Sequence, residues 1–367
     1  MLVTADRVFG GHLYVRNGKI AAISDDGTLP AREELDAAGL YVLPGMLDCH
    51  AHINDPGFTW REDLSHASEA AAVGGVTTLI DMPLQNTPPL TSADAFANKL
   101  AVFEGRSLVD YALWGGLVTD NTAELAGMDA AGAVGFKAFI APVSLGYSSV
   151  DMGLAREALF RIKAFGGLAG FHCEDHALIC AGEAKAKAGG DPTGLSGQPP
   201  RGRGSHRHGE RHRTGPRNRG PRAHLPRQPS PRGRTRPPGT GRWFVRHWRN
   251  LPPLPRFYRR KPLVMRYGLQ VCAEARDGLW EYVLDGTLSC IGSDHSPSRP
   301  DEKDEAVHGV MGAWGGLSGL QSFVQVMFDQ AVTRRGCSPS LLARFASSAI
   351  SSARSKSCLA LRSAASI

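Results

Sequence analysis

Two histidines separated by one residue, His50 and His52 in "DCHAH", are the first residues of this chain that could bind a metal. They follow the apolar run "YVLPGML", which is typical of a buried strand. Alternate residues of a strand share one face, so both imidazoles can reach one ion. An isolated pair is more often two solvated or core histidines. Here the strand end and the following "INDPG" favour a metal site.

Three further residues have the chemistry of such a site. Lys137 lies in the middle of the apolar stretch "VGFKAFI", where an amine is costly to bury unless it is neutralised or paired. It is either a lysine whose amine reaches the surface or a lysine carboxylated by CO₂. His172 in "GFHCEDH" and Asp294 in "GSDHSP" stand at expected strand ends, where a core histidine and a turn-capping aspartate are the ordinary alternatives. Their joint order along successive strands predicts one metal site.

The elements that must position these residues alternate between strand and helix. Strands are expected in "YVLPGMLDCHAH", "VTTLIDMP", "VDYALWGGLV", "AVGFKAFIAP" and "LAGFHCED", with helices between them, one of them capped by Ser92. This alternation predicts a parallel α/β fold, with polar residues at the carboxyl ends of the strands as in α/β barrels. Residues 1–45 read as short strands with a hairpin at Asn17-Gly18. The alternation resumes near residue 273 with a helix and then a strand in "ARDGLWEYVLDGTLSCIGSDHSP".

Several motifs carry a resemblance to a known family. The stretches "DCHAHINDPGFTWRED", "GGVTTLIDMPLQNTPPLT", "GGLVTDN", "VGFKAFI", "FHCEDHALIC" and "AWGGLSGLQ" resemble the cyclic amidohydrolases of the amidohydrolase superfamily, and among them the allantoinases. Dihydroorotases are similar but usually have arginine where this chain has Asn54. Dihydropyrimidinases, or hydantoinases, lack the "DPG…W" and "MPLQNTPP" pattern. The resemblance covers roughly residues 1–195 and 275–335.

The resemblance implies a fold and a metal centre. The fold would be a metal-dependent (β/α)₈ TIM barrel with a small N-terminal β-domain. His50, His52 and Asp294 would hold one of two divalent ions, which the resemblance implies to be zinc, with cobalt or manganese as alternatives. Carboxylated Lys137 would bridge this ion to a second one held by His172 and one further histidine. Asp294 would also be catalytic, taking the proton of the attacking hydroxide and passing it to the leaving nitrogen.

The implied reaction is hydrolysis of a cyclic amide, allantoin to allantoate, in purine catabolism. The partner would be a small-molecule ureide in contact with Asn54, and the enzyme a homo-oligomer, a tetramer by resemblance. No run of 18 apolar residues is present, so no membrane contact is expected. The start "MLVTADRVFGG" does not have the pattern of a signal peptide, and the seven cysteines form no CxxC pair. These features favour the reducing cytoplasm.

One block departs from the rest of the chain. Residues 195–270 hold 20 of the 42 Lys and Arg but only one of the 35 acidic residues. Strand and helix periodicity is lost in stretches such as "GPRAHLPRQPSPRGRTRPPG". A disordered basic linker or an arm that binds single-stranded nucleic acid would account for this composition. Nucleic-acid binding through the block is therefore the alternative that is not an enzyme.

Neither of those readings explains why the histidine-bearing sixth strand implied by the resemblance is missing. The third base of most codons can vary without changing the encoded residue. With the third bases chosen freely, the codons for residues 224–228, read one nucleotide later, can encode Ile-Cys-His-Val-Ser. In the same shifted frame, residues 249–258 can encode Glu-Thr-Cys-Pro-His-Tyr-Leu-Ala-Phe-Thr, which contains a second motif of the family. We interpret residues 195–272 as a frameshifted reading of a GC-rich gene. No nucleic acid is then expected to bind, and the activity of the translated chain is open.

This interpretation predicts a barrel that is incomplete around strands 6–7. The block should lack packed strands, and its histidines should not replace the missing ligand. The expected organisation is a small β-domain at 1–45, the first half of the barrel at 46–194, the aberrant segment at 195–272, the last strand and helices of the barrel at 273–340, and an aberrant Ser/Ala-rich tail at 341–367.

Overall fold

The computed structural model describes residues 1–143, 146–172, 175–187, 273–288 and 290–353. The chain divides into two compact units, Met1–Gly197 with Phe244–Ile367, and Gln198–Trp243. The second unit lies wholly outside the described residues. The predictions of an irregular structure for 195–272 and of a gap at strands 6–7 also lie outside them. The following description concerns the first unit.

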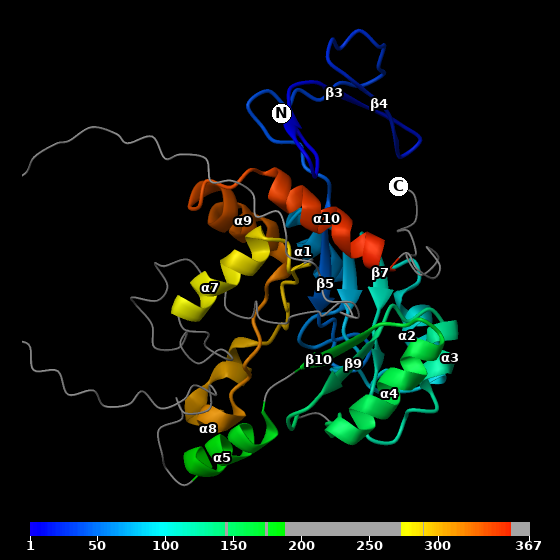
Figure 1. The fold of residues 1–367 in the computed structure, drawn as a ribbon, viewed down its shortest axis with the longest axis vertical. Helices are drawn as coiled ribbons and strands as arrows, with labels where there is room; N and C mark the ends of the chain where they lie inside the picture. Colours follow the sequence, from blue (N-terminus) through cyan, green and yellow to red (C-terminus); the bar gives the residue numbers. More distant parts are fainter. Residues whose placement is uncertain (144–145, 173–174, 188–272, 289, 354–367) are drawn as a thin grey trace, which may run out of the picture. The chain divides into compact units, whose positions relative to one another are not determined.

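The strands and helices alternate along the described chain (Figure 1). The strands are β1 (Leu2–Val3), β2 (Val8–Phe9), β3 (His12–Arg16), β4 (Lys19–Ser24), β5 (Met46–Ala51), β6 (Val76–Asp81), β7 (Asp110–Leu113), β8 (Gly115–Gly116), β9 (Phe136–Phe139) and β10 (Ala169–His172). The α-helices are α1 (Leu64–Val73), α2 (Ala93–Phe103), α3 (Leu125–Ala130), α4 (Met152–Ala164), α5 (His176–Lys187), α7 (Ala273–Leu284), α8 (Glu305–Gly312), α9 (Phe323–Phe328) and α10 (Ser340–Ala353). Short 3₁₀ turns span Pro300–Lys303 and Leu320–Ser322, and a π-helical turn spans Asp329–Thr333.

Strands β5 to β10 form two parallel sheets that continue each other. The first has the order β5-β6-β7 and the second the order β8-β9-β10. Only Trp114 separates β7 from β8. Its backbone N–H donates to the carbonyl of Asp81 (2.9 Å), and the N–H of Gly115 donates to the carbonyl of Gly135 (2.8 Å). Spatial order therefore follows chain order, as the predicted α/β alternation requires.

The segment around Asp294 and His295 returns to β5, the first strand of the parallel arrangement. The Asp294 N–H donates to the His50 carbonyl (2.8 Å), and the His52 N–H donates to the His295 carbonyl (2.7 Å). Ala51 and His295 form a parallel bridge. Contact between the first and last strand positions is what closure of a barrel needs. The mixed α/β class is therefore confirmed, whereas the barrel, predicted to be incomplete around strands 6–7, stays a prediction.

The structure corrects one prediction, that of a strand just before Asp294. The described residues of "GTLSCIGSDHSP" form isolated bridges and no named strand. The cause is irregular backbone on both sides: Asp294 has a left-handed φ of 51°, and the β5 pairing shifts register between Asp48 and Ala51. A β-run read from hydrophobicity alone does not reveal such a break in pairing.

Helix ends follow the residues expected of them. The Ser92 hydroxyl accepts from the Ala95 N–H (3.2 Å), which confirms the predicted N-cap of α2. Helix α1 is capped by Asp63 and ends at Gly74, whose φ is −72°. A left-handed backbone is therefore not the reason for a glycine at position 74. A Cβ there would lie 2.3 Å from the Leu320 carbonyl oxygen, so the glycine allows close approach of the loop after Asp294.

The buried apolar residues form two clusters. The larger one packs strands against helices and includes Leu79, Phe96, Phe136 and Trp280. We call the second one the inner cluster; its members are Leu47, Cys49, Ile80, Met82, Leu84, Ala112, Trp114, Val118, Phe139 and Tyr147. The inner cluster joins residues of β5, β6, β7 and β9, and so supports the strand ends that carry the candidate site.

A fully buried ion pair links β6 to α2. Asp81 and Lys99 form a salt bridge, both with 0% side-chain exposure. Asp81 also accepts from the Ile53 N–H (2.7 Å), and Lys99 donates to the Ile53 carbonyl (3.2 Å). Burial raises the pKa of Asp81 and lowers the pKa of Lys99, and the opposite charge of the partner counters each shift.

We expect Lys99→Ala to lower the free energy of unfolding by about 3–5 kcal/mol, because it leaves the Asp81 carboxylate buried without its cation. The matched control is Arg161→Ala, which removes an exposed pair with Glu157 whose side chains are both 52% exposed. Its expected cost is about 0.3–0.5 kcal/mol. Urea unfolding at neutral pH measures both. Equal costs for the two variants would show that the buried pair does not stabilise the fold.

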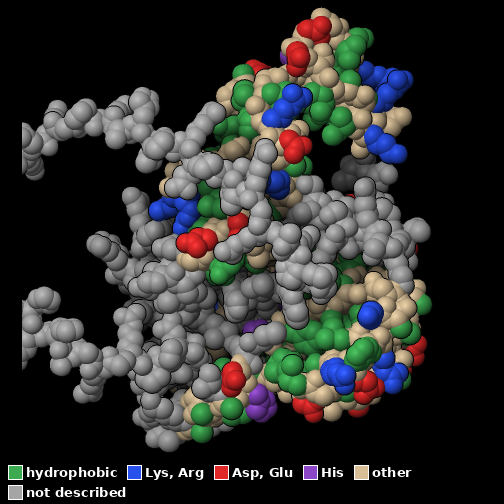
Figure 2. Space-filling model, in the orientation of Figure 1, with side chains coloured by type: hydrophobic (Ala, Val, Ile, Leu, Met, Phe, Trp, Pro, Cys, Tyr) green, Lys and Arg blue, Asp and Glu red, His purple; other side chains and the backbone are tan. Residues whose placement is uncertain are grey.

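The N-terminal strands form antiparallel pairs, β1 with β2 and β3 with β4. Asn17 (φ 52°) and Gly18 (φ 69°) are both left-handed, which confirms the predicted hairpin turn. The β3–β4 hairpin leaves Val15 and Ile20 largely exposed, and Figure 2 shows hydrophobic side chains among charged ones over these strands. Within this N-terminal region, the Val3 N–H donates to the Val42 carbonyl (2.9 Å) and so ties β1 to the stretch just before β5.

Helix α10 crosses the predicted boundary of the aberrant tail at residue 341. Leu341, Leu342 and Phe345 are buried in the larger cluster. The first part of the supposed tail is therefore a packed helix, and residues 354–367 lie outside the described part of the chain. Among the described residues, no helix is both long and apolar enough to cross a membrane.

Candidate metal centre

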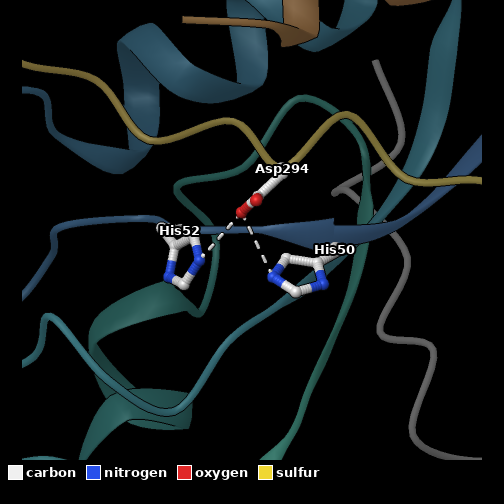
Figure 3. Close-up of side chains that lie close together, drawn as sticks. All are labelled: His50, His52 and Asp294. Atoms are coloured by element: carbon white, nitrogen blue, oxygen red, sulfur yellow. Dashed lines mark ion pairs between the residues drawn. The ribbon is translucent and has the colours of Figure 1, made fainter. Parts of the chain in front are cut away.

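The structure brings His50, His52 and Asp294 together (Figure 3). The Asp294 Oδ1 lies 3.3 Å from the His50 Nε2 and 3.2 Å from the His52 Nε2. One ligand atom from each residue lies within 4.8 Å of the others. The side chains of His52 and Asp294 are buried, and that of His50 is 12% exposed. Asp294 thus meets two predicted ligands that lie more than 240 residues before it in the sequence.

Irregular backbone directs both histidines to the same place. A register shift between Asp48 and Ala51 turns the end of β5. The ring centroids of His50 and His52 then lie 5.2 Å apart. The left-handed φ of Asp294 turns its side chain toward them while its N–H stays bonded to the His50 carbonyl. Strain at such a residue is held by the surrounding hydrogen bonds.

Asp48 fixes the backbone on both sides of the group. Its carboxylate accepts from the His50 N–H (3.0 Å), the Ser293 N–H (3.0 Å) and the Ser293 hydroxyl. Burial raises the pKa of Asp48 to about 6, and these hydrogen bonds oppose that shift. Sequence reasoning did not single out Asp48. The only available signal was its place two residues before His50 in "DCHAH".

His295 and Glu62 hold the segment after Asp294. The His295 Nδ1 accepts from the Gly319 N–H (3.0 Å), so the proton of the neutral ring is on Nε2. That Nε2 donates to the Glu62 Oε2 (2.5 Å). The pair therefore connects the loop after β5 to the loop after Asp294. Sequence reasoning missed both residues, because nothing local in the sequence relates positions 62 and 295.

The donor set fits a divalent transition metal. Two imidazole nitrogens and a carboxylate oxygen are ligands that zinc commonly takes. They converge in a buried place, where the His52 ring is only 1% exposed. A His/His/Asp group that could hold a metal is therefore present at the end of β5.

Lys137 and His172 both contact the ring of Phe139. Lys137 is 3% exposed on β9, which rules out a lysine whose amine reaches the surface. Its Nζ lies 4.9 Å from the centroid of the Phe139 ring, and the His172 ring stacks on the same phenyl ring at 5.1 Å. His172 is not a member of the three-residue group. A shared centre that includes Lys137 and His172 stays a prediction.

Asn54 lies two residues after His52 and is 1% exposed. Neither its Oδ1 nor its Nδ2 has a hydrogen-bond partner among the described residues. A buried amide without partners is unfavourable unless another molecule satisfies it. The structure therefore leaves Asn54 available for the predicted substrate contact.

Comparison with known proteins places the chain among allantoinases, although no family model matches it. It is 31% identical over 336 residues to the allantoinase of Streptomyces avermitilis, covering 82% of this chain and 69% of that one. It is 32% identical over 346 residues to the allantoinase of Escherichia coli K12, covering 89% and 74%. A match to the Deinococcus radiodurans allantoinase is 35% identical over 177 residues, covering 48% and 40%.

Solved structures give the same class. The L-hydantoinase (dihydropyrimidinase) from Arthrobacter aurescens has a TM-score of 0.73 and 26% identity, and the match covers 96% of this chain and 80% of that one. A D-hydantoinase has a TM-score of 0.69 at 21% identity, covering 95% and 79%, which supports the fold alone. The protein is thus an enzyme of the cyclic amidohydrolase class, which hydrolyses cyclic amides. Within that class, the chain belongs to the allantoinase family.

Proposed function

We propose that the protein hydrolyses allantoin to allantoate at the His50/His52/Asp294 group. The observation that carries this proposal is the convergence of these three side chains at the end of β5, in a chain of the allantoinase family. The reaction breaks one C–N bond of the ring and adds water across it.

Each residue of the group has a role that follows from its position. His50 and His52 would hold a divalent ion through Nε2, and Asp294 would complete the set through a carboxylate oxygen. When bound there, such an ion would supply a water molecule of lowered pKa and a positive charge near the ring carbonyl. Asp294 lies beside both imidazoles, so its carboxylate can take the proton of the attacking water and deliver it to the leaving nitrogen.

Lys137 and His172 would serve a second ion, with zinc favoured for both and cobalt or manganese as alternatives. A buried ammonium is costly and repels cations, whereas a carboxylated Lys137 is an anion with oxygen donors. The shared contact of Lys137 and His172 with Phe139 supports their acting together. The further histidine that the second ion needs is the one predicted to be missing from residues 195–272, and that prediction lies outside the described residues.

Asn54 would contact the substrate. Its amide offers one acceptor and two donors, and a ureide ring presents both N–H groups and carbonyls. The amide is buried and has no partner among the described residues. Binding of a ureide would therefore satisfy polar atoms that the fold leaves unsatisfied.

A second candidate substrate class is the hydantoins and dihydropyrimidines, which the Arthrobacter aurescens neighbour favours. Dihydroorotate is a weaker alternative, because Asn54 stands where dihydroorotases usually have arginine. We also propose a cytoplasmic homo-oligomer, a tetramer by resemblance, that works in purine catabolism without binding nucleic acid. Sedimentation with and without RNA would test the tetramer and the absence of nucleic-acid binding.

A substrate panel tests the proposed function directly. We expect the zinc-loaded chain to hydrolyse allantoin with a kcat/KM at least about tenfold above those for hydantoin, dihydrouracil and dihydroorotate, a difference of about 1.4 kcal/mol in transition-state binding. Both the chain as translated and the chain with its reading frame restored across residues 195–272 should be assayed. A preference of the restored chain for hydantoin or dihydrouracil would replace allantoin by the second candidate class.

A further inference from the structure

Two segments that follow the candidate ligands in the sequence contact each other. The first, residues 54–62, follows β5, and the second spans residues 299–316. Arg61 of the first segment forms an ion pair with Glu302 of the second, through its Nε (2.7 Å) and its Nη2. The Cζ of Arg61 also lies 3.9 Å from the centroid of the Trp314 ring. The Arg61 side chain is only 7% exposed, so these contacts are buried.

The first segment is fixed next to Asp294. Glu62, which follows Arg61, accepts a hydrogen bond from His295, which follows Asp294. The backbone of Arg61 is held as well, because its N–H donates to the Phe58 carbonyl (2.9 Å). The backbone at Arg61 is therefore kept near the segment that carries the third candidate ligand.

The second segment approaches the same place. A Cβ at Gly316 would lie 2.4 Å from the Ser296 Oγ and 2.6 Å from the Trp314 Nε1, so a glycine here lets the indole nitrogen approach Ser296. Lys303 donates to the Trp314 carbonyl (3.2 Å) and to the Gly316 carbonyl, which fixes the turn between them. The Trp314 indole is thus held next to a residue only two positions after Asp294.

Two buried N–H donors at this contact have no partner. Neither the Arg61 Nη1 nor the Trp314 Nε1 has a hydrogen-bond partner among the described residues. A buried donor without a partner is unfavourable unless another molecule satisfies it. Guanidinium and indole groups only donate, so the molecule that satisfies them must offer an acceptor. Because the guanidinium lies over the indole ring, one acceptor can be within reach of both donors.

Charge decides which kind of acceptor fits. The carboxylate of Glu302 already balances the charge of Arg61, and the Glu302 side chain is only 12% exposed. The rings of Phe58 and Trp60 lie 5.3 and 4.8 Å from the Arg61 Cζ, so the surroundings are largely apolar. A second carboxylate would leave a net negative charge in this place, which is costly. A neutral carbonyl oxygen adds no charge and has two lone pairs, one for each donor.

We propose that the Arg61 Nη1 and the Trp314 Nε1 bind the carbonyl oxygen of a ureido substituent on the substrate ring. The inference rests on the proposed function, because allantoin carries a ureido group on its hydantoin ring and hydantoin does not. The ring would lie at the His50/His52/Asp294 group, and its substituent would extend to the two donors. Arg61 and Trp314 are then specificity-determining residues, which favour allantoin over the hydantoins of the second candidate class.

Binding of two ligands that differ by the ureido group tests the inference without any assay of activity. The full chain, without added metal so that the ring is not opened, is titrated with allantoin and with hydantoin in a calorimeter. Wild type should bind allantoin about 100-fold more tightly, because each of two hydrogen bonds contributes about tenfold. Trp314→Phe keeps an aromatic ring without the N–H, and Arg61→Lys keeps the charge that faces Glu302 without the second donor. Each variant should lower the ratio of the two Kd values about tenfold.

Trp60→Phe is the matched control, because Trp60 also lies over Arg61 but is 51% exposed. Its ratio of Kd values should equal that of wild type. An unchanged ratio in folded Trp314→Phe and Arg61→Lys would overturn the inference.

Wild type alone decides the matter if those variants do not fold. Equal affinity for allantoin and hydantoin would overturn the inference. Tighter binding of a hydantoin that carries an acetate in place of the ureido group would do the same, since the site would then take a carboxylate. Failure of the proposed function is a separate result, in which the zinc-loaded chain binds allantoin and does not hydrolyse it.

Discussion

Replacing Asp294 by asparagine is expected to reduce kcat/KM for ring hydrolysis by about 10³-fold or more, the largest effect of any single change proposed for this chain. Asparagine keeps the size of the side chain and the backbone contacts of residue 294. It cannot accept a proton, and its amide is a weak metal ligand. The measurement is steady-state hydrolysis together with metal content per chain.

The matched control for that variant is Asp301→Asn, which alters an exposed carboxylate whose side chain is 66% exposed in the loop after Asp294. We expect its kcat/KM to remain within about twofold of wild type, because surface substitutions have small effects. If Asp294→Asn and Asp301→Asn lost activity equally, or if neither did, Asp294 would have no part in proton transfer or metal binding.

Lys137→Ala is expected to lose bound metal and to lower activity by about 10²-fold or more. The reason is that a carboxylated lysine supplies anionic oxygen donors that alanine cannot replace. Added formate or acetate should restore part of the activity, because a small carboxylate can occupy the space of the missing side chain. Metal content and hydrolysis rates, measured with and without the added acid, report the effect.

Lys163→Ala, at an exposed position near the end of α4, is the control for Lys137→Ala. Its metal content and activity should equal those of wild type, and added acid should change neither. A Lys137→Ala protein with full metal content and full activity would refute the carbamate. A folded variant that lost activity and showed no recovery with any short acid would favour a purely structural role for the buried amine.

The candidate residues at the strand ends could be predicted because their signal is local. The two-residue period of the expected strand predicts that His50 and His52 share one face, and in the structure Asp294 joins them where β5 ends. The hairpin at Asn17-Gly18 and the Ser92 cap could be predicted for the same reason: each depends on a few adjacent residues. Local chemistry thus predicts both the turns and the ligand types.

Features that depend on distant contacts could not be predicted. Asp48 binds Ser293, 245 positions away, and Glu62 binds His295, 233 positions away. No periodicity relates such pairs, although they hold the segment that carries Asp294. The left-handed backbone at Asp294 has the same origin, since hydrogen bonds to β5 impose it.

In the C-terminal segment after residue 340, amino-acid composition is a weak guide to secondary structure. Residues after 340 are rich in serine and alanine, yet Leu341, Leu342 and Phe345 form one buried face of α10. A helix needs only a narrow apolar stripe to pack, and three large side chains in two turns provide it. The prediction of a frameshift at 195–272 lies outside the described residues. Resequencing the gene across those codons decides it.

Anomalous X-ray diffraction at the zinc edge, from crystals of the zinc-loaded protein, tests the central claim most directly. The account predicts a zinc peak about 2.0–2.2 Å from the His50 Nε2, the His52 Nε2 and a carboxylate oxygen of Asp294. A zinc peak elsewhere in the protein, with these three side chains in contact only with one another, would contradict it.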